Sequence, residues 1–415
     1  MPLFLPKTEA FGIDLSDRSV KMGQVKKKGS KLVLKSLGEK EIPAGFINDG
    51  IINKDKEQEL IKIIQECKNS VLGAKIKTKK AICSLPEENS FIKVINIPGM
   101  KEEEMENVIK WQIESNFPVK MQNVYFDWQI IEGKEKSQKK QKKIQEKNKE
   151  NQEETHPICV SVVPKEVINS YFSIFKNSGI EPIVFEIESM ATVRSLIKSY
   201  IERPVIILDI GKCGAGLTFF SGETILFTSH IDISGQKFVE VISKSLGVSL
   251  DRAEKIKRKV GLAGLQKQGI KLSKINFPLT NLVADVKTPK IEGEKKIGEK
   301  EDEVDAEKVF NALVPILTDL SEQIKQYIDY FKDFKETKEI PVGSIEKIIV
   351  CGGESRLIGF TDFIHASLNV STEIANIPEK ISISKNITKN PSVRDFLSYT
   401  TVVGLAIRGA TAEII

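Results

Sequence analysis

Short runs in which apolar and polar residues alternate predict strands at the start of the chain. Three such runs cover residues 11–14, 19–26 and 31–37 and are separated by polar turns. Apolar residues from Leu60 to Val71 then recur at the spacing of one helix face, and a further strand is expected at residues 80–85. Strands followed by a helix and another strand imply a mixed sheet with a helix packed on one face.

Residues 91–131 have a different, shorter pattern of apolar positions. A strand is expected at residues 91–97, a helical stripe runs from Met105 to Ile113 and ends before Pro118, and another strand is expected at residues 124–131. The pattern predicts a small inserted αβ subdomain.

The rest of the chain continues with strands and helices. A long apolar stripe at residues 310–331 contains Pro315, which predicts either a kink or a helix that starts later than the stripe. The other expected strands are 158–163, 183–187, 205–208, 347–351 and 372–375, and the other expected helices are 165–177, 190–200, 237–246, 251–260, 357–368 and about 393–408.

Two stretches lack a pattern of buried positions. Residues 133–155 and 266–305 are rich in Lys and Glu and too poor in apolar residues to offset the entropy of ordering. We expect a disordered loop at 133–155 and an insertion at 266–305. A polybasic membrane contact is the alternative for the first stretch, but Glu residues interleave its lysines.

Length and composition indicate a multidomain globular protein. The chain has 415 residues, of which 40% are hydrophobic and 29% charged, and a length of this order suggests about two to four domains. The net charge is +5, and residues 133–154 alone hold eight Lys against five Glu, so a nucleic-acid surface is not expected.

Cysteine and histidine usage narrows the chemistry and the compartment. The five cysteines are scattered and the three histidines lie far apart, which favours free thiols in a reducing compartment and argues against a zinc or histidine metal centre. Neither a signal peptide nor an apolar run near 18 residues is found. We therefore expect a cytoplasmic protein.

A glycine-rich turn offers the first candidate chemistry. Residues 205–208 form a short apolar run that leads into Asp209, and Gly211, Gly214 and Gly216 follow. Backbone N–H groups at such glycines can approach an anion closely, because no Cβ intervenes. A carboxylate at the strand end can hold Mg²⁺ through water. The turn is thus a candidate phosphate site.

Related elements occur elsewhere in the chain. Asp14 precedes a serine-containing turn near the start, and the pair Gly352-Gly353 follows a strand near the end. Glu254 and Lys257 are three residues apart on one helix face, a spacing that suits ribose hydroxyls and a base. Two alternatives stay open: Asp14 can simply cap a turn, and Glu254–Lys257 can be a solvated ion pair.

The order of these elements resembles the actin-like ATPase superfamily. Within it, the chain resembles the PilM family of type IV pilus assembly proteins, which is similar to the cell-division protein FtsA. The segments that carry this likeness are Ile97-Pro98 with Phe117-Pro118, residues 186–191, residues 247–257 and residues 404–407.

The resemblance implies an α/β actin-like ATPase fold. It predicts two lobes, each with a mixed sheet of about five strands and helices, and a small αβ subdomain inserted in the first lobe. The expected divisions are 8–90 and 164–203 for the first lobe, 91–163 for the inserted subdomain, 204–242 and 346–389 for the second lobe, 243–345 for its helical subdomain, and 390–415 for a C-terminal helix that returns to the first lobe.

The resemblance also assigns site residues. Asp14 and Asp209 would hold Mg²⁺ through water, and Glu186 or Glu188 would position a water molecule. Ser16 stands where the family usually has glycine, and Ser234-Gly235 where it has a glycine pair. The phosphate residues would be Asp14, Ser16, Asp17, Ser19, Lys21, Asp209, Gly211, Cys213 and Gly214, and the adenosine residues Gly235, Glu254, Lys257, Gly352, Gly353, Glu354 and Arg356.

By resemblance, the protein binds ATP or ADP with Mg²⁺ and hydrolyses it slowly at most. It would dock the cytoplasmic N-terminal segment of a PilN-like inner-membrane protein near residues 91–97, in a type IV pilus or related type II secretion platform. Contact with the membrane would be indirect, through that partner. The resemblance also allows contacts with the pilus assembly ATPases and self-association.

Two other functions stay open. A sugar-kinase-like phosphotransferase of the same superfold would need a general base, for which Glu186 and Glu188 are available, but no sugar-binding polar cluster is evident. An FtsA-like division scaffold would anchor through a C-terminal amphipathic helix, and residues 411–415 do not resemble one.

Overall fold

The computed structural model describes most of the chain. The described residues are 9–100, 102–131, 155–198, 200–263, 306–334, 340, 343–377, 381–389 and 396–411. The loop expected at 133–155 lies outside them, apart from Thr155, where a strand already begins. The insertion expected at 266–305 also lies outside the described residues.

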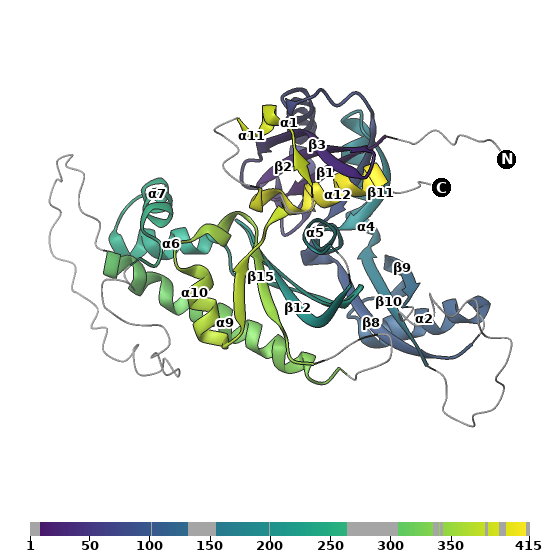
Figure 1. Cartoon of the computed structure of the whole chain (residues 1–415). Coiled ribbons are helices and arrows are strands. Elements are labelled where there is room, and N and C mark those ends of the chain that lie inside the picture. The colour runs from purple at the N-terminus through teal and green to yellow at the C-terminus, as the bar shows by residue number, and fades with distance from the viewer. Residues whose placement is uncertain are drawn as a thin grey trace.

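Two lobes, each built on a sheet, make up the molecule (Figure 1). In the first, β1, β2 and β3 are antiparallel, whereas β7 runs parallel to β1, and β11 runs parallel to β7. The order of the first sheet is β11 (Glu181–Ile187), β7 (Lys80–Leu85), β1 (Phe11–Ser16), β2 (Ser19–Lys28), β3 (Lys31–Glu41) and β17 (Ser382–Ile383), with β6 (Leu72–Gly73) also paired to β3.

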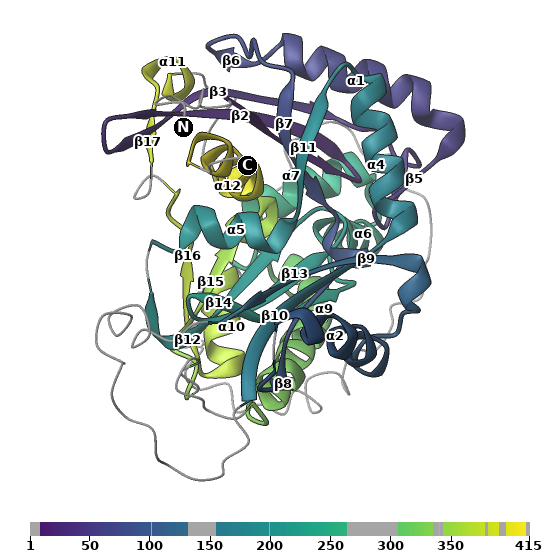
Figure 2. The same cartoon turned by 90° about the vertical axis from the view of Figure 1, so that its right-hand side faces the viewer.

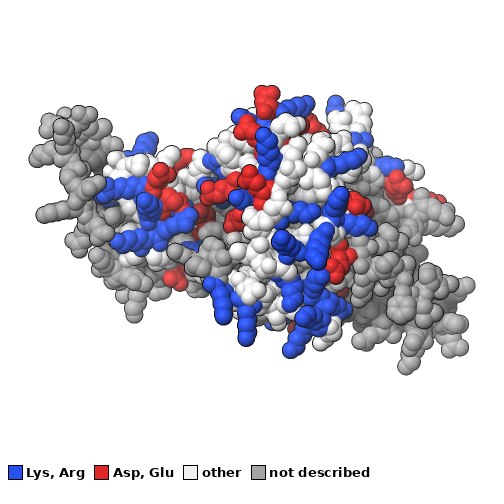
Figure 3. All heavy atoms as spheres, turned by 90° about the horizontal axis from the view of Figure 1, so that it is seen from above, with Lys and Arg blue, Asp and Glu red and all other residues white. Residues whose placement is uncertain are grey.

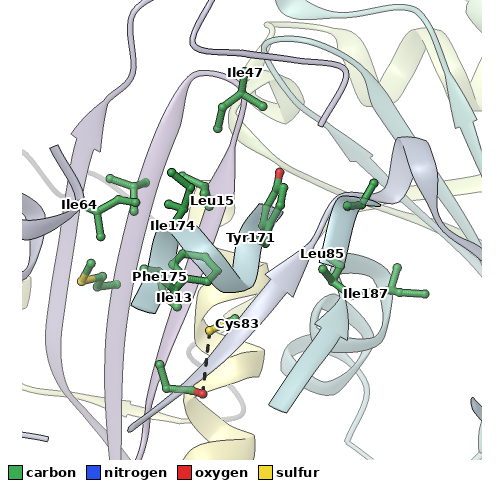
Figure 4. Packing of buried hydrophobic residues seen from close by; sticks show 14 of the residues in the cluster. Ile13, Leu15, Ile47, Ile64, Cys83, Leu85, Tyr171, Ile174, Phe175 and Ile187 are labelled. Carbon is green, nitrogen blue, oxygen red and sulfur yellow. Dashed lines mark hydrogen bonds between the residues drawn. The ribbon is translucent and has the colours of Figure 1, made fainter. Parts of the chain in front are cut away.

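Successive side chains of β1 point to opposite faces of the first sheet. Ile13 and Leu15 point into a core that includes Tyr171 and Phe175 of α4 (Lys165–Asn177) and residues of α1 (Glu57–Asn69) (Figure 4). Gly12 faces α12 (Thr400–Thr411), where a Cβ would lie 2.7 Å from the carbonyl oxygen of Val402. The C-terminal helix therefore packs on the sheet of the first lobe.

The second sheet is larger than the sequence suggests. Its order is β16 (Ser371–Ile374), β15 (Lys347–Cys351), β12 (Ile201–Ile210), β13 (Ala215–Gly222), β14 (Thr224–Ile231), β8 (Phe91–Pro98), β10 (Thr155–Pro164) and β9 (Val124–Ile130). The predicted two-lobed α/β fold is confirmed, but the described sheets contain seven and eight strands instead of about five. The second grows because β8 meets β14 at Lys93 and Phe227, which joins the inserted strands to this lobe.

The inserted subdomain has the strand, helix and strand that its pattern predicts. Its helix is α2 (Glu102–Asn116), and Met105, Ile109 and Ile113 pack on the sheet formed by β8, β10 and β9. The subdomain lies below α4 of the first lobe in Figure 2. Helix α5 (Glu188–Leu196), expected at 190–200, begins two residues earlier and ends four residues earlier.

Helices cover the second sheet and pack on its apolar face. The long helix α9 (Ala306–Phe331) runs through Pro315, so the alternative of a later start is wrong. Among the described residues, no helix is both long and apolar enough to cross a membrane. The remaining helices are α6 (Gly235–Leu246), α7 (Leu250–Val260), α10 (Phe360–Leu368) and α11 (Lys385–Thr388), and a short hairpin joins β4 (Ile47–Asn48) to β5 (Ile51–Ile52).

Candidate nucleotide site between the lobes

The tight turn between β1 and β2 is held by its own polar side chains. The Ser16 hydroxyl lies 3.2 Å from both the carbonyl oxygen and the hydroxyl of Ser19. The Asp17 carboxylate accepts hydrogen bonds from the backbone N–H groups of Asp49, at 2.8 Å, and Gly50, at 3.0 Å. Asp17 therefore fixes a neighbouring turn, whereas Ser16 and Ser19 remain at the tip.

The glycine-rich turn after β12 is anchored to the start of α6. The N–H of Gly211 donates to the carbonyl oxygen of Gly214 at 2.9 Å, and the N–H of Gly235 donates to the carbonyl oxygen of Gly211 at 3.0 Å. A Cβ on Gly214 would lie 2.1 Å from the His230 ring, so any larger residue would displace that ring. The turn and the N-terminus of α6 thus form one unit.

A cavity of about 350 Å³ opens between the two lobes. Its wall includes Asp17, Arg18 and Asp49 from the first lobe and Cys213, Ser234 and Gln236 from the second. The Arg18 guanidinium donates to Gln236 Oε1 at 2.9 Å and so bridges the lobes. Both predicted phosphate turns therefore border one cleft.

Asp14 and Asp209, which do not line this cavity themselves, lie within electrostatic reach of each other and of Lys21. Burial raises the pKa of Asp14, and the nearby Lys21 ammonium opposes that rise. Burial also raises the pKa of Asp209 to about 6, with Lys21 opposing and Asp14 adding to the rise. The Asp14 and Asp209 carboxylates, which come from opposite lobes, thus both interact with the Lys21 ammonium.

Glu186 and Glu188 lie in different environments although only Ile187 separates them. The Glu186 carboxylate is bound by both nitrogens of the Arg194 guanidinium, one at 2.6 Å, and by Arg408 at 3.2 Å. Glu188 is the first residue of α5, and its pKa is raised well above the usual range by burial and by nearby carboxylates, beginning with Asp14. Only Glu188 therefore faces the cleft carboxylates.

Several buried polar side-chain atoms of the described residues have no hydrogen-bond partner. Tyr171 is fully buried, and its pKa is raised by burial and by the nearby Glu188 and Glu88. The Glu87 Oε2 accepts from the Ser189 N–H at 3.1 Å, but its Oε1 is unpaired. Among the described residues, the unpaired buried side-chain atoms are Asp14 Oδ1, Glu87 Oε1, Tyr171 Oη, Ser189 Oγ and Thr228 Oγ1.

These atoms fit a hydrated cation. Buried acceptors without donors are costly in a core and are instead typical of a site that takes a ligand or water. Carboxylate and hydroxyl oxygens are the groups that Mg²⁺ and its water shell prefer. Within the described ranges, no three His, Cys, Asp or Glu side chains are placed to share a metal ion directly. The carboxylates of Asp14 and Asp209 could contact such an ion through its water shell.

The predicted adenosine residues also meet. Lys257 is only 2% exposed, and its Nζ lies 2.7 Å from Glu354 Oε2, 2.9 Å from Glu254 Oε2 and 3.4 Å from the Gly235 carbonyl oxygen. The alternative of a solvated Glu254–Lys257 pair is wrong, because the lysine is buried. A Cβ on Gly235 would clash with the Glu354 carboxylate at 2.2 Å.

The Gly352-Gly353 pair brings a third turn against Asp209. Gly352 has a φ of 87°, and a Cβ there would lie 2.4 Å from Asp209 Oδ1. No heavy atom would come within 4 Å of a Cβ on Gly353, so its backbone is open. Arg356 ends the same turn and has an exposed side chain.

Sequence reasoning missed several residues of the cleft. Arg18 and Gln236 bridge the lobes. Glu87 and Glu88 lie close enough to Glu188 to raise its pKa, and Glu88 Oε1 lies 3.9 Å from His230 Nδ1. The sequence position of Glu87 and Glu88 could have pointed to them, because they follow the end of β7, which runs parallel to β1. Charged residues at the carboxyl ends of such strands commonly form binding sites.

Glu87 should make stability depend on pH. Burial raises its pKa to about 7 from the usual 4.5. Between these values the folded protein keeps a proton that the unfolded chain has released, so stability falls as pH rises through this window and is level above it. Glu87→Gln should remove this fall and gain on the order of 3 kcal/mol above pH 7, as measured by chemical unfolding.

The matched control for this experiment is Glu223→Gln, an exposed position on the second lobe. It should leave the pH dependence of unfolding unchanged. The assignment is wrong if Glu87→Gln and the wild-type protein lose stability equally as pH rises.

Comparisons with known proteins agree with this geometry. The sequence matches the family model described as type IV pilus assembly protein PilM over residues 12–270 and 281–410. A chain of the solved PilM–PilN type IV pilus biogenesis complex is similar in structure, with 19% identity, a TM-score of 0.72 and coverage of 98% of this chain and 100% of that one.

The ethanolamine utilization protein EutJ from Carboxydothermus hydrogenoformans is also similar. It is 13% identical, with a TM-score of 0.50 and coverage of 97% of this chain and 90% of that one. At these identities the structural likeness supports the fold, whereas the family match spans nearly the whole sequence. The chain therefore belongs to the PilM family of type IV pilus assembly proteins and has the actin-like ATPase fold.

Proposed function

We propose that this protein is a nucleotide-binding scaffold of the inner-membrane platform that assembles type IV pili, or of a related type II secretion platform. It binds ATP or ADP with Mg²⁺ between its lobes and docks the cytoplasmic N-terminal segment of a PilN-like membrane protein. The observation that carries the nucleotide part is the meeting of Asp14 and Asp209, with an unpaired buried oxygen on Asp14.

Each part of the cleft has a role in this proposal. Asp14 and Asp209 would hold a hydrated Mg²⁺, while Lys21 and the Ser16 and Ser19 hydroxyls would bind the phosphates. The bound metal ion offsets the charge of the phosphates and of the two carboxylates. The adenosine side is formed by the open backbone of Gly353 and by the Lys257 network, which offers both carboxylate acceptors and an ammonium donor.

Glu188 is the residue that we propose positions water. Its pKa is raised well above the usual range because it is buried beside other carboxylates. A protonated carboxylic acid can orient a water molecule but cannot accept its proton, so it is a poor general base. With Glu186 bound by two arginines, we propose slow hydrolysis at most, as suits a scaffold.

Removing the Asp209 charge should weaken nucleotide binding. Asp209→Asn keeps the shape of the side chain but loses a ligand for the Mg²⁺ water shell, so the dissociation constant for Mg-ATP should rise about tenfold or more by titration calorimetry. Asp362→Asn, an exposed position on α10, is the matched control and should bind as the wild-type protein does. Equal affinity of the Asp209 variant and the control would overturn the assignment.

The docking part of the proposal rests on family membership and on the edge of the inserted subdomain. The solved relative is a PilM–PilN complex, which supports a PilN-like partner here. Strand β8, near which the sequence suggests docking, has β10 along one edge and touches β14 at Lys93 on the other. Among the described strands, β9 pairs only with β10, so its outer edge is the better candidate for strand addition.

An exposed stripe of α4 continues from that edge. Lys165 reaches from α4 to the Gln122 carbonyl oxygen at 2.8 Å, and its ammonium lies 5.4 Å from the centroid of the Tyr125 ring on β9. Phe172, two helical turns further along α4, is 44% exposed, and Tyr125 is 47% exposed. These two aromatic rings would give a bound peptide its apolar anchors.

The double variant Tyr125→Ala/Phe172→Ala should weaken peptide binding. The probe is a synthetic peptide with the cytoplasmic N-terminal sequence of the PilN-like protein of the same system, and a loss of at least tenfold in affinity is expected by fluorescence anisotropy. Trp111→Ala removes an exposed aromatic from α2 and serves as the control. Weakening by the control alone would contradict this location, and no binding to the wild-type protein would contradict docking itself.

The family match favours this role over both alternatives from the sequence, a sugar-kinase-like enzyme and an FtsA-like scaffold. We propose a cytoplasmic position at the inner face of the membrane, reached through the partner. The family resemblance alone leads us to expect contacts with the pilus assembly ATPases and self-association.

A further inference from the structure

Lysines gather at one end of the first-lobe sheet. β1 and β7 begin at this end, because Phe11 pairs with Ala81, and β2 ends where β3 begins, because Lys28 pairs with Lys31. The Ser16–Ser19 turn of the cleft lies at the opposite end of β1 and β2. We call this end the basic edge; its lysines are Lys27, Lys28, Lys31, Lys35, Lys68, Lys75, Lys77, Lys79 and Lys80.

Contacts hold the segments of the basic edge side by side. The N–H of Ala74 donates to the Lys35 carbonyl oxygen at 2.9 Å, which brings the segment after β6 against β3. The Lys68 ammonium lies 5.1 Å from the centroid of the Phe11 ring, at the first residue of β1. Figure 3 shows Lys and Arg side chains crowding the first lobe in the centre and lower part of the view.

Positive charge at this edge has little compensation. Residues 67–80 contain five lysines and residues 26–35 another five, and neither stretch contains Asp or Glu. No ion pair within the described part of the chain involves any lysine of the basic edge. Glu9 pairs with Lys26, and Glu181 lies opposite Lys80 at the start of β11. Burial lowers the pKa of Lys68, and repulsion from Lys79 lowers it further.

We propose that the basic edge binds the anionic headgroups of a membrane surface directly. This goes beyond the indirect contact through a partner that the resemblance implies, and it needs neither nucleotide nor peptide. Four neighbouring strands spread the lysines over roughly 15 Å, so several lie within one or two Debye lengths of a plane placed against the edge.

The residue types favour a lipid surface over other anionic partners. No arginine occurs between Arg18 and Arg194, so the edge lacks the planar donors that grip a carboxylate or phosphate in two places. The Phe11 ring at this edge is fully buried, so a base could not stack on it. Lysine ammonium groups are compact point charges that suit diffuse attraction to many headgroups.

The position of the edge agrees with the proposed docking surface. Helix α4 runs from Lys165, beside β9, to Asn177, just before β11 begins at the basic edge. Its 13 residues span about 20 Å, and Lys176 is exposed near the end that adjoins the edge. A partner segment that leaves the membrane and binds at β9 would thus keep the basic edge close to the headgroups.

The experiment is sedimentation of the full chain with vesicles, without partner peptide. Vesicles of phosphatidylglycerol and phosphatidylcholine in equal parts should bind the wild-type protein, whereas vesicles of phosphatidylcholine alone should not, and high salt should abolish binding. The variant Lys31→Gln/Lys75→Gln/Lys77→Gln/Lys79→Gln changes four exposed side chains. Each lysine contributes roughly fivefold, so affinity should fall about 100-fold or more.

The matched control places the same charge change on the second lobe. Lys244→Gln/Lys255→Gln/Lys259→Gln/Lys325→Gln also alters four exposed lysines and should change vesicle affinity by less than about threefold. The proposal is wrong if the wild-type protein ignores anionic vesicles, if both quadruple variants lose affinity equally, or if duplex DNA binds the basic edge while vesicles do not. Peptide docking at β9 can fail without affecting this result, and the reverse also holds.

Discussion

Asp14 and Asp209 approach each other from opposite lobes, and the electrostatic repulsion between their buried carboxylates governs how the elements around them are arranged. Burial and mutual proximity raise the pKa of Asp209 to about 6, with Lys21 as the nearby cation that opposes the rise. Folding alone gains nothing from this arrangement, since buried like charges cost free energy. A cation between the lobes would relieve the repulsion, so ligand binding and lobe closure would be coupled.

The surrounding elements keep the two aspartates where they meet. Gly352 lets a third turn approach Asp209 closely, and the glycine-rich turn is tied to the start of α6 by backbone hydrogen bonds. On the far side, Glu186 ties β11 to α5 and α12 through two arginines. The cleft thus joins rigid parts of both lobes, which suits a scaffold that reports nucleotide binding to a partner more than it suits rapid chemistry.

Much of this arrangement follows from local patterns in the sequence. Period-two runs and helical stripes predict most elements, and glycine positions predict the turns at Asp209 and Gly352. Contacts between segments far apart in the fold could not be predicted. Lys93 joins the inserted strands to the second sheet, and the Arg194 guanidinium binds the Glu186 carboxylate. The basic edge could not be predicted from the sequence either, because its lysines lie on separate segments that only the pairing of the strands brings together.

Hydrogen–deuterium exchange with and without Mg-ATP tests the central claim, that one ligand is held by both lobes. If both lobes hold the ligand, backbone amides should exchange more slowly at residues 16–19 in the first lobe and at residues 211–214 and 352–356 in the second, all at the same nucleotide concentration. Protection of one lobe only, or no protection at saturating Mg-ATP, would contradict it.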